Sequence, residues 1–214
     1  MFKRFTQEAA QPAQAEGEQI ELPNPVYNSD TSIEEALHKR RSVREYLQEG
    51  LTLPEVSQLL WAVQGVTGPR GKRTAPSAGH LYPLETYLVT QEVAELPKGI
   101  YHYLPNEHAL VRIAEKDVQD ELTRAGSEQD SLRQAAAVII LTAVYERTSW
   151  KYGERTARYV HMEVGCTAQN AALQVESLGL GTVFIGAFQD DEVKRILALP
   201  ENEHPLCLLP VGRK

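Results

Sequence analysis

The run AAAVIILTAVY, residues 135–145, decides the fold of this chain. Its side chains are apolar and rich in β-branched residues, and they do not alternate with polar ones. A continuous apolar run of this length is typical of a strand that is covered on both faces. We therefore predict that residues 135–145 form a central strand with helices packed around it.

The segments on either side show strand and helix patterns in turn. Further strands are expected at 85–90, in a hairpin over 99–113 that turns at Pro105-Asn106, at 182–188 as a short strand or extended loop, and at 205–212. Helices are expected from Ser32 into the basic segment after it, and over 51–65, 115–126, 158–179 and 190–199. No linker or internal repeat divides the chain, so one α+β domain with a mixed sheet is the simplest prediction.

Local signals mark where these helices begin and end. Ser32 with Glu35, and Thr52 with Glu55, have the spacing of a capping box. Asp190 is the expected cap of the 190–199 helix. The 158–179 helix carries one apolar stripe at steps of three and four, made by Val160, Val164, Ala168, Ala171, Val175 and Leu178, and Gly179 ends it.

Residues 1–28 differ in character from the rest of the chain. They are rich in Gln, Glu, Ala and Pro and show little periodicity. We predict a flexible N-terminal arm over 1–28, either free or packed on a partner subunit, followed by a single domain over 29–214.

Composition excludes several classes of protein. The chain has 214 residues with 42% hydrophobic content, which is enough for a sizeable core, and a net charge of -7, which argues against nucleic acid as a partner. No apolar run approaches the roughly 20 residues that span a bilayer, and the N-terminus has no apolar signal core. Cys166 and Cys207 form no C-x-x-C pair, so a reducing cytoplasm is the expected location.

Common catalytic motifs are absent from the sequence. The glycines of GLGTVFIG, residues 179–186, follow a helix and precede a strand, whereas a dinucleotide fingerprint needs the opposite order. The glycines of GPRGKRT, residues 68–74, are too close together for a P-loop. The six histidines have no metal-ligand spacing and no G-x-S-x-G element occurs, so we predict no metal site and no serine hydrolase.

A basic segment, HKRRSVREY, lies at the end of the first expected helix, which runs into it. Arg40, Arg41 and Arg44, with Ser42 between them, put guanidinium groups and a hydroxyl in one place. Guanidinium groups match phosphate oxygens with two hydrogen bonds, so this segment suggests phosphate binding. The alternative is a solvated basic face with no ligand.

A second unusual segment, RTAPSAGHLYPLETYLVT, covers residues 73–90. It places a turn of small residues, with His80 and Tyr82, directly before a core strand. Small residues let backbone N–H groups approach a ligand closely, so the turn is a candidate binding loop. A plain surface turn is the alternative.

Four motifs together resemble the FMN-dependent nitroreductase superfamily, and within it the SagB-type branch, which is similar to azoline dehydrogenases. They are RRSVREY, PSAGHLYPLE, KYGERTARYVHMEVGCTAQN and GLGTVFIGAF, and they occur in that order within residues 32–212. The resemblance implies a nitroreductase-like fold, with a central, mainly antiparallel sheet flanked by helices, in a homodimer with the flavin at the interface.

The resemblance also implies a set of residues that bind a tightly held FMN. These are Arg40, Arg41, Ser42, Arg44, Pro76, Ser77, Ala78, Gly79, His80, Tyr82, Ile185, Gly186, Ala187 and Arg213. Gly186 and Ala187 match residues beside flavin N5 in the family. Two positions depart from the common pattern, because many nitroreductases carry asparagine at His80 and glutamate at Gly186.

Lys151 and Tyr152 resemble the lysine and tyrosine that act as base and support in azoline dehydrogenases. A lysine beside a flavin can accept a proton as hydride leaves a substrate. The alternative is a lysine stem beside a packing ring. By the same resemblance, Gln169 and Asn170 lie in the dimer core with a structural role.

The expected function is an FMN-dependent oxidoreductase in which NAD(P)H is the electron donor and a small oxidised molecule the acceptor. Both half-reactions use one pocket, so ping-pong kinetics are expected. Two alternatives remain open: a SagB-type azoline dehydrogenase that acts on a modified peptide, and a flavin-binding protein without turnover.

Overall fold

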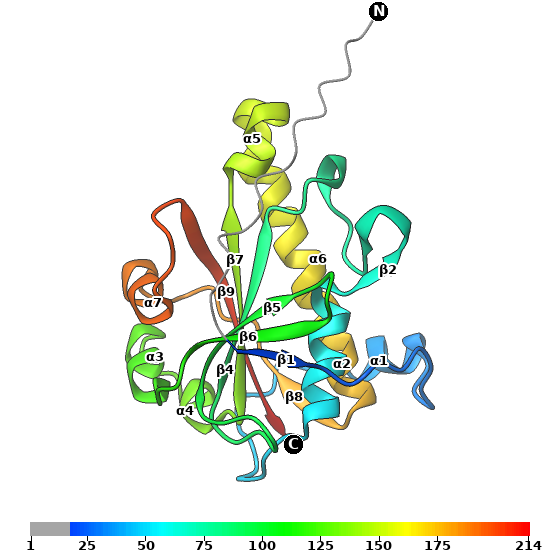
Figure 1. The fold of residues 1–214 in the computed structure, drawn as a ribbon. Helices are drawn as coiled ribbons and strands as arrows, with labels where there is room; N and C mark the ends of the chain where they lie inside the picture. The colour runs from blue at the N-terminus through cyan, green and yellow to red at the C-terminus, as the bar shows by residue number, and fades with distance from the viewer. Residues whose placement is uncertain (1–17) are drawn as a thin grey trace, which may run out of the picture.

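A seven-stranded sheet forms the centre of the molecule (Figure 1). The computed structural model describes residues 18–214, and the strand order in the sheet is β1-β6-β5-β4-β7-β9-β8. The strands are β1 (Gln19–Glu21), β4 (Leu84–Thr90), β5 (Gly99–Leu104), β6 (Ala109–Ala114), β7 (Ala137–Val144), β8 (Leu180–Thr182) and β9 (Glu203–Arg213). Every pairing between these strands is antiparallel, so the prediction of an α+β fold with a mainly antiparallel sheet is confirmed. Parallel pairing, which a mixed sheet would include, occurs only at isolated bridges in the described residues.

Strand β7 is the central strand that the 135–145 run predicted. It pairs with β4 from Leu84↔Ala143 to Thr90↔Ala137 and with β9 on its other side. Its side chains alternate between two separate clusters of buried residues, with Ile139 and Leu141 in one and Val138 and Ile140 in the other. Both faces are therefore covered, which is why this strand lacks a polar face.

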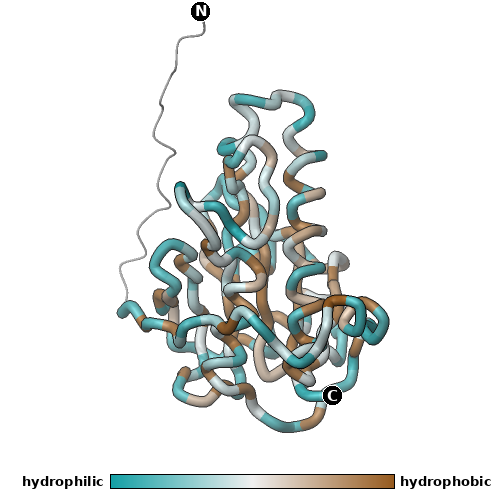
Figure 2. Tube along the Cα trace, turned by 90° about the vertical axis from the view of Figure 1, so that its right-hand side faces the viewer, coloured by the Kyte–Doolittle hydropathy of each residue, from teal (hydrophilic) through white to brown (hydrophobic). Residues whose placement is uncertain are grey.

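Helices cover the two faces of the sheet as separate layers (Figure 1). Helices α2 and α6 pack with Ile139 and Leu141, and helices α3, α4 and α7 pack with Val138 and Ile140. The helices are α1 (Ile33–Lys39), α2 (Leu53–Gln64), α3 (Gln119–Ala125), α4 (Asp130–Gln134), α5 (Glu146–Tyr152), α6 (Thr156–Ser177) and α7 (Asp190–Leu197). Figure 2 shows the hydrophobic residues gathered along the strands between these layers.

Two short elements lie between α2 and β4. A hairpin of β2 (Val66–Gly68) and β3 (Lys72–Arg73) projects beside α6 (Figure 1). It is followed by a 3-10 turn over Ala78–His80, which leads directly into β4. The candidate binding loop is therefore attached to a fully buried strand.

The predicted caps are confirmed at two helices and wrong at a third. The Ser32 side chain accepts a hydrogen bond from the Glu35 N–H, and Thr52 and Glu55 form a complete capping box. At α7 the cap residue is Gln189, and Asp190 is the first helical residue. An acidic residue is favoured both at the cap and in the first turn of a helix, so Asp190 is compatible with either position. The helix begins one residue earlier than predicted.

The expected flexible arm does not extend to residue 28. Strand β1 pairs with β6 through Ile20↔Leu110, and the Val26 N–H donates to Gln58 Oε1 at 2.8 Å. Residues 18–28 are therefore attached to the domain, because the short QIE segment completes an open sheet edge. The remainder of the predicted arm lies outside the described residues.

No helix in residues 18–214 combines the length and the hydropathy that crossing a bilayer requires.

The capping box at α2 gives a first prediction. Thr52→Ala removes an acceptor for the Glu55 N–H and should lower the free energy of unfolding by about 1 kcal/mol, whereas Thr52→Ser should change it little. Denaturant unfolding of the three proteins measures this difference. Equal stability of the alanine and serine variants would show that the cap contributes nothing here.

Candidate functional site

The basic segment Arg40–Arg44 lies beside the end of β8. Ser42 forms a parallel bridge with Thr182, and the Val43 N–H donates to the Thr182 carbonyl at 2.9 Å. Glycine is needed next to this bridge, since a Cβ on Gly181 would lie 2.7 Å from the Val43 side chain. Through this bridge, the segment that follows α1 runs beside β8, the edge strand of the sheet.

The guanidinium groups of this segment are available to a ligand. Arg41 and Arg44 are exposed and Arg40 is half-buried. Arg41 donates to the carbonyls of His38 and Arg40 at 3.0 and 2.7 Å. No carboxylate within residues 18–214 forms an ion pair with any of the three arginines, so this part of the chain does not neutralise their charge. An anion such as phosphate fits this arrangement.

Arg213, also expected at the cofactor, has a structural partner instead. Its guanidinium donates two hydrogen bonds to the Glu55 carboxylate, both at 3.0 Å, and lies 3.7 Å from Glu49. This pair connects the end of β9 to the first turn of α2. We therefore leave Arg213 out of the site proposed below.

The segment after β8 continues from the arginines along the sheet. Ile185 is buried and exchanges two backbone hydrogen bonds with Leu208, each at 3.0 Å. Gly186 and Ala187, which follow it, are exposed. Both segments are thus joined to β9, the arginine segment through Ser42, Thr182 and Val211 and the Ile185–Ala187 segment through Leu208.

The Pro76–Tyr82 loop is held in a tight, partly left-handed conformation. Gly79, His80 and Tyr82 have φ of 64°, 65° and 45°. The Ser77 hydroxyl accepts a hydrogen bond from the Tyr82 N–H at 2.9 Å. The Arg73 guanidinium lies 4.4 Å from the centre of the Tyr82 ring, and the Arg73 N–H donates to the Tyr82 hydroxyl. These contacts fix the loop before it enters β4.

Lys151 and Tyr152 lie against this loop, at the end of α5. A Cβ on Gly79 would be 2.7 Å from Lys151 Nζ and 2.8 Å from the Tyr152 hydroxyl. The structure therefore joins two motifs that are 72 residues apart, at 79 and 151, in one cluster. An amine and a phenol beside a glycine turn form a polar surface that can donate and accept protons.

Glu163 of α6 lies behind the same loop and was missed by the sequence analysis. Its side chain is 3% exposed, and its Oε1 has no hydrogen-bond partner. Burial raises the pKa of Glu163 to about 7, although hydrogen bonds from Ser77 and the Ala78 backbone and the charge of Arg73 act to lower it. The helical period contained a signal, because Glu163 is three residues after Val160 on the buried stripe.

A buried ion pair, also missed by the sequence analysis, supports the loop from the other face of the sheet. Glu85 of β4 pairs with Arg147 and with His102 Nε2 at 2.9 Å, and these interactions keep the pKa of Glu85 below its usual range. Arg147 also donates to the Tyr82 carbonyl at 3.2 Å. The end of the loop is therefore attached to a buried charge network.

Within one chain, the two candidate groups are at different ends of α6. Glu163, behind the loop, precedes the last residue of the helix by 14 residues, or about 21 Å along the axis, and β8 follows that end. Figure 1 shows α5 at the start of α6 and α1 and β8 near its end. A single chain thus does not bring Arg41 and Ser77 into a shared cleft.

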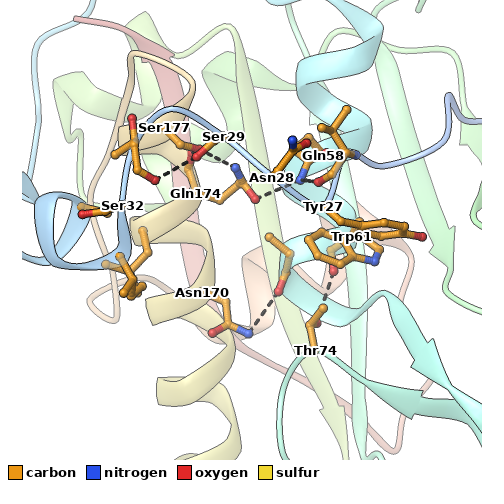
Figure 3. A pocket seen from close by; sticks show the side chains of 16 residues that line it. Tyr27, Asn28, Ser29, Ser32, Gln58, Trp61, Thr74, Asn170, Gln174 and Ser177 are labelled. Carbon is orange, nitrogen blue, oxygen red and sulfur yellow. Dashed lines mark hydrogen bonds between the residues drawn. The ribbon is translucent and has the colours of Figure 1, made fainter.

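A groove of about 490 Å³ lies beside α6, but it contains none of the expected cofactor residues (Figure 3). The Val26–Ile33 segment, α1, α2 and α6 line it. Asn170 lies here and donates to the Ala62 carbonyl at 3.1 Å, which is a structural contact between α6 and α2. Within residues 18–214, no three His, Cys, Asp or Glu side chains gather closely enough to bind a metal ion.

The family model described as "Nitroreductase family" matches residues 37–213. The chain belongs to the nitroreductase family. This assignment places it among oxidoreductase enzymes and confirms the resemblance, as well as the fold that the resemblance implied.

Individual relatives agree with this assignment. A Methanocaldococcus jannaschii protein named as a nitroreductase is 48% identical over 92% of this chain and 96% of its own length. A crystal structure from Anabaena variabilis, described as a nitroreductase, superposes with a TM-score of 0.81 and 32% identity over 92% of this chain and 42% of its own.

Two relatives are more distant and longer. The microcin B17-processing protein McbC of Escherichia coli is 28% identical over 61% of this chain and 50% of its own length, which agrees with the SagB-type branch. The NADPH-flavin oxidoreductase of Vibrio harveyi is 28% identical over 49% and 47%. The chain therefore spans about half the length of these two relatives.

The contact between Gly79 and α5 gives a second prediction. Gly79→Ala and Gly71→Ala should each lower stability by about 1 kcal/mol, because both glycines are left-handed and alanine is strained there. Only Gly79→Ala should move Lys151 and Tyr152, since a Cβ on Gly71 meets nothing within 4 Å. Unfolding experiments and the NMR shifts of the Lys151 ε-methylene measure the two effects. Unchanged shifts in Gly79→Ala would contradict the packing described above.

Proposed function

We propose that this protein binds FMN tightly and acts as an FMN-dependent oxidoreductase with NAD(P)H as electron donor. The observation that carries this proposal is the Arg40–Arg44 segment, whose cations have no carboxylate partner in the described chain. In a chain of net charge -7, unneutralised arginines at one position favour a concentrated anion, and the FMN phosphate is one. Family membership supports the same cofactor.

Each group of residues has a part in holding the flavin. Arg40, Arg41, Ser42 and Arg44 would bind the phosphate and the pyrimidine end, where positive charge favours the anionic reduced flavin. The Pro76–Tyr82 loop would form a second wall. Ile185, Gly186 and Ala187 would lie near N5, where the exposed Gly186 leaves room for a donor or acceptor.

The functional unit in this proposal is a homodimer. Glu163, behind the loop, lies about 21 Å along α6 from the end that leads to β8, but a two-fold axis with antiparallel α6 helices brings the start of one helix beside the end of the other. The face of α6 available for this contact includes Met162, which is 60% exposed, and Gly165, beside which a Cβ would meet nothing within 4 Å. The arginines of one protomer would then lie beside the Pro76–Tyr82 loop of its partner and complete the flavin site there.

The chemistry follows from this arrangement. FMN, when bound, supplies two-electron redox chemistry by accepting and giving a hydride. The protein positions the donor and then a small oxidised acceptor in one pocket, so ping-pong kinetics are expected.

Both cysteine thiols are free, which supports the proposed cytoplasmic location.

Purified protein should be yellow or take up added FMN, and Arg40→Ala should bind FMN about tenfold more weakly or worse. The physical reason is the loss of a charge-assisted hydrogen bond to the phosphate. FMN titration followed by flavin fluorescence measures the affinity. Arg124→Ala, which removes an exposed arginine from α3, is the matched control and should bind normally.

Anaerobic mixing with NADH or NADPH then separates an enzyme from a passive binder. Bleaching of the flavin band shows turnover, and bound FMN that neither donor reduces would favour the flavin-binding protein without activity. A protein that remains colourless after incubation with FMN would contradict the main proposal.

A second candidate function is azoline dehydrogenation on a modified peptide. The contact of Lys151 and Tyr152 with the Gly79 turn favours it, and so does the similarity to McbC. In this reading the Lys151 amine takes the proton that leaves the substrate as hydride is transferred.

Lys151→Ala separates these two functions. It should lower azoline oxidation about 100-fold without loss of FMN if Lys151 is the base, and leave NAD(P)H oxidation near the wild-type rate. Steady-state rates with a thiazoline peptide and with a nitroaromatic acceptor measure the two activities. Wild-type rates on both substrates would remove Lys151 from the chemistry, and Lys98→Ala, at a distant exposed ion pair, is the control.

A further inference from the structure

Glu163 is a buried carboxylate that the proposed chemistry does not use. It is 3% exposed, and its Oε1 has no hydrogen-bond partner in the described structure. A carboxylate in such a position costs stability, because it loses its hydration without a full set of donors. A residue that costs stability and lies directly behind a binding loop has the features of a functional group.

The contacts of Glu163 lead to the loop itself. Ser77 and the Ala78 backbone lie close enough to this carboxylate to lower its pKa, and Ser77 Oγ accepts a hydrogen bond from the Tyr82 N–H at 2.9 Å. A hydroxyl has one proton to donate, so an ionised Glu163 takes that proton and leaves the Ser77 oxygen as an acceptor toward the loop. An ionised carboxylate beside Ser77 thus favours the orientation in which the Ser77 oxygen accepts from the Tyr82 N–H.

We propose that Glu163 is a positioning residue of the flavin site, whose ionised carboxylate holds Ser77 and Ala78 in the conformation that binds flavin and so makes flavin affinity depend on pH. This inference rests on the proposed function, because it assigns the ligand of the loop as FMN. Protonated Glu163 loses its charge and one acceptor oxygen, and Ser77 and Ala78 then lose one of the interactions that hold this part of the loop. Ordering a loop before binding increases affinity, since the cost of ordering is removed from the binding step.

The direction of the pH effect follows from the burial of this group. The pKa of Glu163 is raised to about 7, so the carboxylate is ionised above this pH and protonated below it. If only the ionised form binds FMN, affinity should fall about tenfold between pH 8 and pH 6. Other charged or titratable groups near the loop are Arg73 of β3, His80 and Tyr82 of the loop, Lys151 and Tyr152 of α5, and the Arg147–Glu85 pair below Tyr82.

The test compares FMN dissociation constants at pH 6 and pH 8 in wild type, Glu163→Gln and Glu203→Gln. Glu203 is the matched control, because it is another buried carboxylate with a raised pKa, and it contacts Thr142 rather than the loop. We expect about tenfold weaker binding at pH 6 in wild type and in Glu203→Gln, and a much smaller change in Glu163→Gln. The FMN phosphate also titrates near pH 6, but it does so equally in all three proteins.

A stability measurement distinguishes this role from a merely structural one. An acid whose native pKa is raised destabilises the folded state above that pKa. Without flavin, Glu163→Gln should therefore melt at a higher temperature than wild type at pH 8, and the difference in melting temperature should be smaller at pH 5. The same variant should bind FMN more weakly than wild type at pH 8. A residue that only supports the fold would lower the melting temperature when it is replaced.

Two further variants keep the inference falsifiable. Glu163→Asp keeps the charge, shortens the reach and should retain the pH dependence with weaker affinity, and it replaces Glu163→Gln if that protein does not fold. The inference would be overturned if Glu163→Gln kept the wild-type pH dependence of FMN affinity. It would also be overturned if His80→Asn lost this pH dependence while Glu163→Gln retained it. Wild type that binds no FMN at either pH would instead overturn the proposed function and, with it, this role.

Discussion

Helix α6 packs a stripe of small and β-branched side chains, from Val160 to Val175, against the face of the sheet formed by Ile139 and Leu141. This contact determines the position of both candidate groups. The start of the helix carries Glu163 beneath the Pro76–Tyr82 loop, and its end leads into β8, which pairs with the arginine segment through Ser42 and Thr182. The length of one helix thus sets the separation of the two halves of the site.

In the proposed homodimer, that separation is the reason why two chains would form each flavin site. A rigid helix of 22 residues cannot bend its two ends into one pocket, so each chain presents half of the proposed site at each end of α6. Two-fold symmetry solves this problem with one interface, since the same contact forms two complete sites. The exposed Met162 and the open space beside Gly165 lie on the face that such an interface would use.

The Pro76–Tyr82 loop is held by contacts on both faces of the sheet. Glu85 and Arg147 hold its end from one face of the sheet, and the Tyr82 ring packs under the Arg73 guanidinium on the other. Glu163 is the exception, because its carboxylate is buried with one oxygen unpartnered. His80 and Tyr82 of the loop have left-handed backbone conformations, and the unpartnered Glu163 oxygen lies directly behind them, a combination that is common near functional sites.

The sequence by itself determined the central strand, the caps of α1 and α2 and the length of α6, because each depends on the pattern of neighbouring residues. It also identified the arginine segment and the glycine loop, since Arg40–Arg44 and Gly79 are chemically unusual where they stand. Only the tertiary structure decided that β1 adds an edge strand beside β6, that Glu55 neutralises Arg213, and that Glu163 and Lys151 lie beside the loop. These outcomes depend on contacts between residues far apart in the chain, and such contacts are formed by the packing of whole helices and strands rather than by local sequence.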